Sequence, residues 1–209
     1  MNERVDKVEE FVAAIFANST QKKYWPHTQR VHAYASRIGR DEGADLDVLL
    51  PAVWLHDIGM TVDAGFPSHV EKSKMLATCI LKGCGYDDKT SATIVKVLGA
   101  HHPRPGAMLD TLEEKVLYDA DNMDIIGVFG VLRWIGTMPQ TTKELVASID
   151  LFVGIVDSCV TARGSLFFTQ SARKIGDSVV SDTVAYFGKV KSHLLQFEVE
   201  GATPAPFSF

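Results

Sequence analysis

Apolar residues recur three or four positions apart along most of this 209-residue chain, and stretches that alternate apolar with polar residues are hard to find. Such spacing gathers apolar side chains on one face of an α-helix, so it predicts helices rather than strands. Prolines and glycine clusters interrupt the pattern and mark the turns. The helices that we expect are residues 4–17, 26–40, 46–56, 69–82, 88–101, 112–135 with a break near Gly127, 142–160 and 169–197. The predicted fold class is all-α, a helical bundle.

The chain shows no internal repeat and no linker long enough to divide it, and 209 residues suffice to bury a sizeable core. We therefore expect a single domain over residues 1–197. The remaining residues, 198–209, are rich in small residues and proline, so we expect a flexible or loosely docked tail there.

Composition restricts the cellular compartments and the classes of partner that we expect for this chain. The net charge of −5 gives no reason to expect a nucleic-acid polymer or an anionic membrane as partner. The first residues lack a signal-peptide layout, and no stretch approaches the roughly 18 apolar residues of a membrane span. The cysteines Cys79, Cys84 and Cys159 are odd in number and lack Cys-x-x-Cys spacing, so we interpret them as reduced packing residues. A cytoplasmic protein is expected.

The stretch WLHDIGM places His56 and Asp57 in an apolar run, where an unpaired charge would be costly to bury. Helical spacing directs other polar residues to the interior as well. His27 is in register with Val31 and Tyr34 further along its helix, and His101 and Asp121 follow apolar residues at intervals of three or four positions. Several separate segments therefore direct an imidazole or a carboxylate to the core.

Each of these residues alone is more often a hydrogen-bonded core histidine or a helix cap than a ligand. Together they need partners that few core groups supply. A divalent cation satisfies all of them at once, because imidazole nitrogen and carboxylate oxygen suit Mn, Fe, Co, Ni or Zn. We therefore expect a metal site.

The residues at this point resemble the HD-domain superfamily of metal-dependent phosphohydrolases. The pattern is His27 in HTQRV, then His56-Asp57 in WLHDIG, then Asp121 in LYDADNMD, with similar flanks over roughly residues 24–136. The resemblance implies an all-helical bundle of the HD-domain type. It also implies that the four motif residues bind one divalent metal ion, which could be Mg as well as Mn, Fe, Co, Ni or Zn.

By the same resemblance the chain would hydrolyse a small phosphate ester or a nucleotide. A bound cation polarises a phosphoryl oxygen and lowers the pKa of its water, which then attacks phosphorus. Asp57, Arg30 and Lys72 are the residues that we expect to take part in catalysis. Arg30 lies three residues after His27, so it projects near that ligand, and basic side chains neutralise phosphate oxygens.

His69 and His101 are candidate ligands of a second metal, because some members of the superfamily use histidines in these regions, with the aspartate of the pair as a bridge. His102 is a weaker candidate. The alternative is that these histidines contact substrate phosphate or carry protons.

Two other functions stay open. Some HD-like proteins hold two irons and are oxygenases that cleave C–C or C–P bonds, and His69 and His101 would supply the extra ligands. The other is a metal-binding regulatory module without turnover, although all four core ligands are present. The partner expected is a small phosphorylated molecule. The helices after residue 140 could cover the core or form a homodimer surface, and the sequence does not decide between these.

Overall fold

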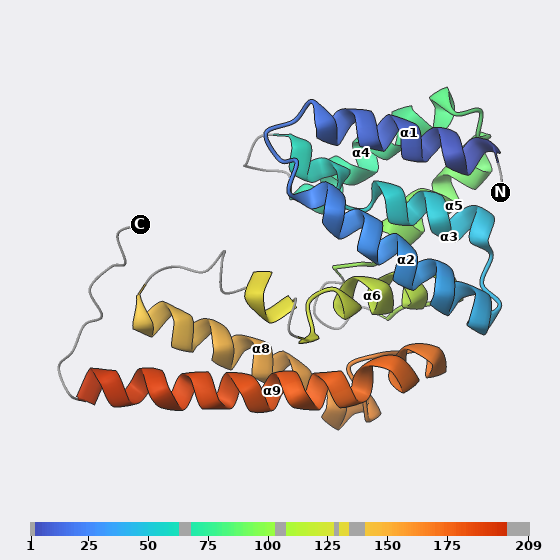
Figure 1. The fold of residues 1–209 in the computed structure, drawn as a ribbon. Coiled ribbons are helices and arrows are strands. Elements are labelled where there is room, and N and C mark those ends of the chain that lie inside the picture. The colour runs from blue at the N-terminus through green and yellow to red at the C-terminus, as the bar shows by residue number, and fades with distance from the viewer. Residues whose placement is uncertain (1–2, 63–67, 103–107, 128–129, 134–140, 200–209) are drawn as a thin grey trace. The chain divides into compact units, whose positions relative to one another are not determined.

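The computed structural model describes residues 3–62, 68–102, 108–127, 130–133 and 141–199, with side chains up to residue 196. Every regular element in these ranges is a helix, which confirms the all-α fold class (Figure 1). The elements are α1 Glu3–Ala17, α2 Tyr24–Glu42, α3 Leu46–Leu55, the short 3-10 helix η1 Ile58–Thr61, α4 His69–Gly83, α5 Asp88–Leu98, α6 Leu112–Met123, α8 Thr142–Arg163 and α9 Gln170–Val199.

The chain forms two compact units. The first contains the residues up to Asp124 together with Phe168–Ala172, and the second contains Ile125–Phe167 and the residues from Arg173 onward. A single domain over residues 1–197 therefore stays a prediction. Most of the expected tail lies outside the described residues, apart from the end of α9.

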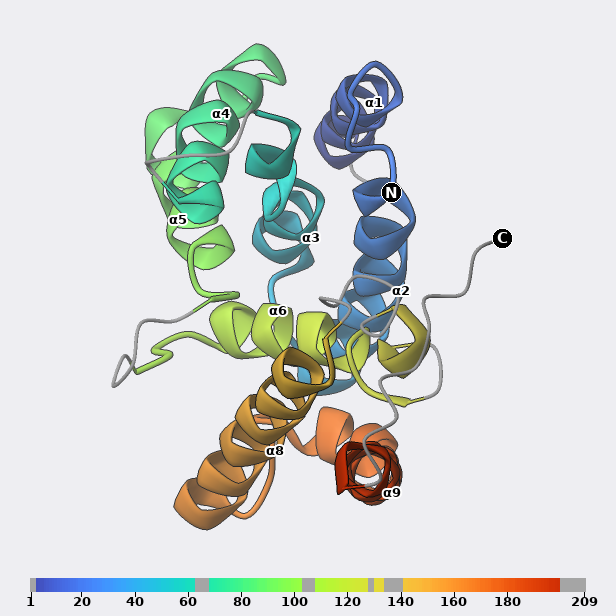
Figure 2. The same cartoon turned by 90° about the vertical axis from the view of Figure 1, so that its left-hand side faces the viewer.

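Helix α3 lies at the middle of the first unit, where α1, α2, α5 and α6 pack against it (Figure 2). Its sequence LDVLLPAVWL is apolar on almost every side, which is typical of a helix surrounded by others. Asp45 caps its start, because the carboxylate accepts a hydrogen bond from the Asp47 N–H at 2.9 Å. At its other end the chain turns tightly, with the His56 N–H donating to Val53 O. This turn delivers His56 and Asp57 to the centre of the unit.

Two helices end earlier than the sequence predicts. α5 stops at Leu98 rather than at residue 101, because Pro103 follows closely and cannot continue a helix. α6 stops at Met123, ahead of the expected break at Gly127. Gly127 has a φ of +74°, a left-handed conformation that glycine adopts readily, so the helix does break near it.

Asp119 on α6 fastens the segment 168–172 to the first unit. Its fully buried carboxylate accepts hydrogen bonds from the N–H of Phe168 at 2.8 Å and from both the N–H and the hydroxyl of Thr169 at 2.7 Å. Buried N–H and hydroxyl donors that lose their acceptor destabilise the folded protein, so these hydrogen bonds stabilise the position of the segment.

We expect Asp119→Ala to lower the free energy of unfolding by about 3 kcal/mol, because two backbone donors and a hydroxyl would lose their buried acceptor. Urea unfolding followed by circular dichroism measures the change. The exposed Asp41→Ala should change it by less than about 0.5 kcal/mol. Equal stability of the two variants would show that the Asp119 contacts do not matter.

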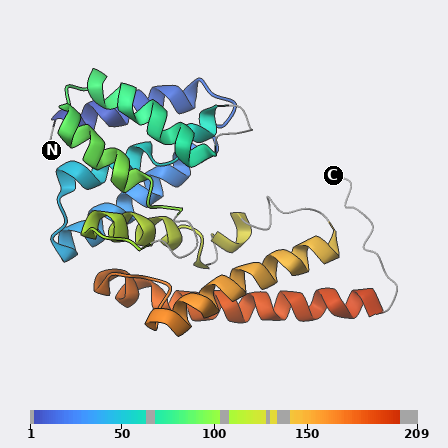
Figure 3. The ribbon, with the colours of Figure 1, turned by 180° about the vertical axis from the view of Figure 1, so that it is seen from behind.

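In the second unit, α8 and α9 lie side by side (Figure 3). The buried residues Val131, Ile149 and Phe187 form a cluster against which neighbouring apolar side chains of both helices pack. Lys191 on α9 donates to a carboxylate oxygen of Asp150 on α8 at 2.5 Å. The apolar seam is therefore flanked by an ion pair at the surface.

The expectation that no stretch approaches the length and apolar composition of a membrane span is wrong. By length and composition, α8 is apolar enough to cross a bilayer. One such helix is weak evidence for a membrane span by itself, and 11% of its apolar window is buried. α8 also carries the exposed carboxylates of Asp150 and Asp157 in its middle, and charged groups are costly inside a bilayer.

Candidate metal centre

Helix ends in the first unit bring together the residues of the His…His-Asp…Asp pattern. His27 lies in the first turn of α2, His56 and Asp57 follow α3, and Asp121 lies in the last turn of α6. His27 Nε2 lies 3.2 Å from Asp121 Oδ1 and 3.5 Å from Asp57 Oδ2. His56 Nε2 lies 3.3 Å from His27 Nε2. The structure therefore places all four residues in one cluster, and three of them are buried.

Backbone carbonyls orient two of the imidazoles. His56 Nδ1 lies 2.7 Å from Val53 O, and His101 Nδ1 lies 2.6 Å from Leu98 O. A carbonyl can only accept, so Nδ1 carries the hydrogen in each neutral ring and Nε2 presents its lone pair to the cluster. Each carbonyl belongs to the end of the preceding helix. The helix ends therefore fix which nitrogen can bind a cation.

A carboxylate that the sequence analysis missed orients the third imidazole. His27 Nδ1 lies 2.7 Å from Oδ2 of the buried Asp124. Arg30 holds the same carboxylate, with Nε donating to Oδ1 at 2.5 Å and Nη2 donating to Oδ2 at 3.1 Å. A carboxylate behind a histidine is the usual support of a metal-binding imidazole. The available signal was Asp124 in DADNMD, three positions after Asp121 on the same helix face.

Arg30 accordingly lies one layer behind the ligand cluster, where it pairs with Asp124. Its expected contact with a phosphate stays a prediction. Lys72, the other basic residue singled out, lies on the first turns of α4 together with His69, and both residues line a pocket beside η1.

A second group of histidines adjoins the first. His69, His101 and His102 have ring nitrogens within 4.8 Å of one another. His69 Nε2 lies 3.8 Å and His101 Nε2 lies 3.6 Å from Asp57 Oδ1, whereas Oδ2 of the same carboxylate faces His27. Asp57 therefore stands between the two groups and offers one oxygen to each.

The charges within the cluster are coupled. Burial opposes a charge on Asp57 and on Asp121, but the neighbouring imidazoles outweigh it and lower the pKa of both carboxyl groups. Burial likewise opposes a charge on His27, yet hydrogen bonds to Asp121 and Asp124 raise its pKa to about 9. Burial lowers the pKa of His56 to about 4, so that ring is neutral at pH 7. The carboxylates thus draw positive charge into the cluster.

These donors fit a divalent cation. The Nε2 atoms of His27 and His56 face each other at 3.3 Å while both Nδ1 atoms are used, so only a proton or a cation between them satisfies both lone pairs. His101 Nε2 is buried and has no hydrogen-bond partner among the described residues. Several imidazoles with carboxylate oxygens suit Mn, Fe, Co, Ni and Zn better than Mg, which prefers oxygen ligands.

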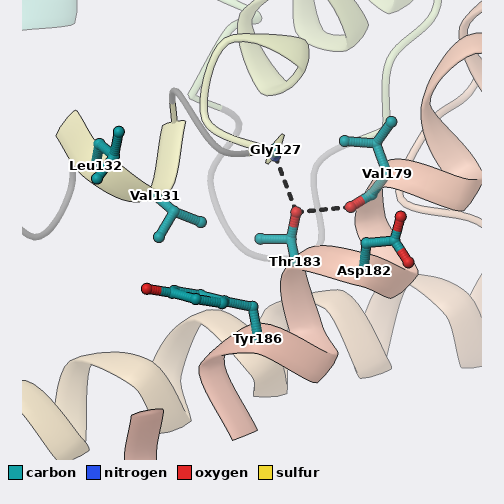
Figure 4. Close-up of a pocket in the computed structure, with 7 residues that line it drawn as sticks. All are labelled: Gly127, Val131, Leu132, Val179, Asp182, Thr183 and Tyr186. Carbon is teal, nitrogen blue, oxygen red and sulfur yellow. Dashed lines mark hydrogen bonds between the residues drawn. The ribbon is translucent and has the colours of Figure 1, made fainter. Parts of the chain in front are cut away.

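A separate cavity of about 380 Å³ lies in the second unit and is lined mainly by apolar side chains (Figure 4). At its wall the Thr183 hydroxyl accepts a hydrogen bond from the Gly127 N–H at 2.9 Å and donates to Val179 O at 2.6 Å. No histidine or basic residue lines it among the residues that the structure describes. Among its described lining residues the cavity offers a single carboxylate, that of Asp182, and no cation for a phosphate.

Comparison with known proteins agrees with the geometry. Residues 24–126 match the family model of the HD domain. The chain is 25% identical to the uncharacterized protein YpgQ of Bacillus subtilis over 134 residues, which is 62% of this chain and 64% of that protein, less than two thirds of the relative.

Solved structures share the fold. A predicted HD superfamily hydrolase from an uncultured Thermotogales bacterium has a TM-score of 0.62 at 24% identity, covering 90% of this chain and 91% of that chain. Bacillus subtilis YpgQ in complex with ADP has a TM-score of 0.57 at 19% identity, covering 91% and 94%. Residues 24–126 of the chain are an HD domain.

Proposed function

We propose that the chain is a metal-dependent phosphohydrolase that acts on a small phosphate ester or a nucleotide. One observation carries the proposal: imidazole nitrogens and carboxylate oxygens from separate helices of an HD domain converge on Asp57. Such a group of donors has no evident purpose in packing, because each polar atom must be desolvated. The solved structure of YpgQ with ADP supports a phosphorylated ligand.

In this proposal His27, His56, Asp57 and Asp121 hold the cation. When bound, the cation would polarise a phosphoryl oxygen and lower the pKa of a water molecule, so that the water can lose a proton near neutral pH. Asp124 keeps His27 Nε2 directed inward by accepting from its Nδ1, and Arg30 holds Asp124 in place. Lys72, beside His69 in the pocket, neutralises charge on the phosphate oxygens.

The second group of histidines supports a second cation, with Asp57 as the bridging ligand. Asp57 Oδ1 lies toward His69 and His101, while Oδ2 lies toward His27. Such a pair of metal ions also serves the second candidate function, a di-iron oxygenase that cleaves C–C or C–P bonds.

The two candidate functions differ in their need for O₂. We would load the protein with Mn²⁺ or with Fe²⁺ and assay a set of phosphate monoesters, diesters and nucleotides, with and without oxygen. Phosphate ester hydrolysis that is equal in the two atmospheres supports the phosphohydrolase. Oxygen consumption with iron, and no hydrolysis with any metal, would favour the oxygenase. Cation binding without any turnover would leave the regulatory module.

We expect Asp124→Asn to weaken cation binding about 10- to 100-fold, because the amide cannot offer the charged acceptor that holds the proton on His27 Nδ1. Competition with a chromophoric chelator measures the dissociation constant. Asp88→Asn, an exposed aspartate at the start of α5, serves as the control and should bind as the wild type does. Unchanged binding by Asp124→Asn would remove Asp124 from the centre.

A further inference from the structure

A polar pocket of about 330 Å³ lies in the first unit, between the turn that joins α1 to α2 and the segments η1 and α4. One wall comes from the turn and the start of α2, and the other from η1 and the first turns of α4. The described residues that line it are Thr20, Gln21, Lys23, Tyr24, Gly59, Met60, Thr61, Val62, His69 and Lys72.

The lining is positively charged, although the protein carries a net charge of −5. Lys23 and Lys72 come from opposite walls, and no aspartate or glutamate is among the described lining residues. Hydroxyl and amide groups make up much of the rest. Two lysines and several neutral hydrogen-bonding groups, with no carboxylate among the described lining residues, form an environment that favours an anion.

Two lining residues relate the pocket to the candidate metal centre. His69 lines it and also has its Nε2 3.8 Å from Asp57 Oδ1. Gly59 lines it too, and follows Asp57 by two positions in the chain. The pocket therefore shares His69 with the candidate metal centre.

We propose that this pocket binds a second phosphate of the substrate, next to the one that is cleaved, and that Lys23 determines this preference. The proposal rests on the proposed function for the phosphate at the centre. It names the substrate class as molecules with two or more linked phosphates. A single lysine would serve a monoester, whereas a linked phosphate adds about one further negative charge, which Lys23 can neutralise.

Lys23 is suited to a test because its side chain does not support the fold. It is exposed, it stands at the N-cap of α2 without a side-chain capping bond, and its Nζ lies 5.5 Å from the centre of the Tyr24 ring. Lys22 is its matched control: it has the same charge, is equally exposed, and is absent from the described lining of the pocket.

The experiment uses two ligands that cannot be hydrolysed, methylenediphosphonate with two linked phosphonates and methylphosphonate with one. Their binding to the full-length, Mn²⁺-loaded protein is measured by calorimetry at a fixed free Mn²⁺ concentration. We expect Lys23→Gln to weaken binding of the diphosphonate about tenfold and to leave methylphosphonate unchanged. Lys23→Arg should retain the wild-type value, and Lys22→Gln should change neither ligand.

Unchanged diphosphonate binding by Lys23→Gln, or an equal loss for both ligands, would overturn the proposal. The proposed function is tested separately, by hydrolysis of the phosphate monoesters, diesters and nucleotides of the assay described above. A selective loss of the diphosphonate without any hydrolysis would leave the second-phosphate site standing and the phosphohydrolase refuted. Hydrolysis with no selective loss would have the opposite meaning.

Discussion

Replacing Asp57 with alanine should remove the bound cation and reduce phosphate ester hydrolysis by at least about 1,000-fold. Among the described residues, Asp57 has oxygens that face both groups of histidines, so its loss affects every proposed cation position. Without it the imidazoles would still gather, but the negative charge that neutralises a divalent ion would be reduced.

The same variant should lose less stability than the burial of Asp57 suggests. Asp57 is buried, with its side chain 11% exposed, and an unpaired charge there would cost on the order of several kcal/mol. Alanine removes that charge together with the cation that balances it, so no uncompensated ion is left behind. Elemental analysis and the release of inorganic phosphate measure the two effects, with Asp41→Ala as the exposed control. Full metal content and full activity in Asp57→Ala would refute the ligand assignment.

Gly59→Ala should be strongly destabilising. A Cβ atom at this position would lie 2.1 Å from His69 O and 2.7 Å from Ser73 N, distances that atoms of this kind do not tolerate. The Gly59 N–H also donates to Ser73 Oγ at 2.9 Å, which ties η1 to α4. Both obstacles are backbone atoms of α4, so relief requires that the two segments separate.

We expect Gly59→Ala to lower the free energy of unfolding by about 3 kcal/mol or more, as measured in urea. Because the separation would also move His69 away from Asp57, hydrolysis should fall with it. Gly83→Ala is the matched control on α4, because nothing lies within 4 Å of its added Cβ. It should be neutral or stabilising by up to about 1 kcal/mol. Wild-type stability in Gly59→Ala would mean that η1 and α4 do not approach so closely.

The helices and the members of the cluster followed from spacing within single segments. Apolar intervals of three and four predict where a helix lies and which side chains face inward, and this located His27, His56, Asp57 and Asp121. What they could not predict is which residue of another helix stands behind a ligand. The contact of Asp124 with His27 joins α2 to α6, and no spacing rule within one helix contains it.

The sequence also did not predict accurately where helices end. The helix over residues 88–101 was expected to carry His101 within it, but α5 ends at Leu98, whose carbonyl then accepts from the His101 ring. The ring direction depends on this exposed carbonyl. Similarly, the sequence of α8 does not show whether its apolar residues pack against α9 or face a lipid bilayer, because both environments select apolar residues.

The most direct test is to titrate metal-free protein with Mn²⁺ while hydrolysis of p-nitrophenyl phosphate and of a nucleoside diphosphate is followed. The protein would be purified without chelators or a metal-affinity column and then stripped. The account predicts no hydrolysis by the metal-free chain, and activity that rises with added Mn²⁺ and saturates at one or two equivalents per chain. Hydrolysis that is as fast without the cation, or absent at every concentration of Mn²⁺, Fe²⁺, Co²⁺, Ni²⁺ and Zn²⁺, would contradict it.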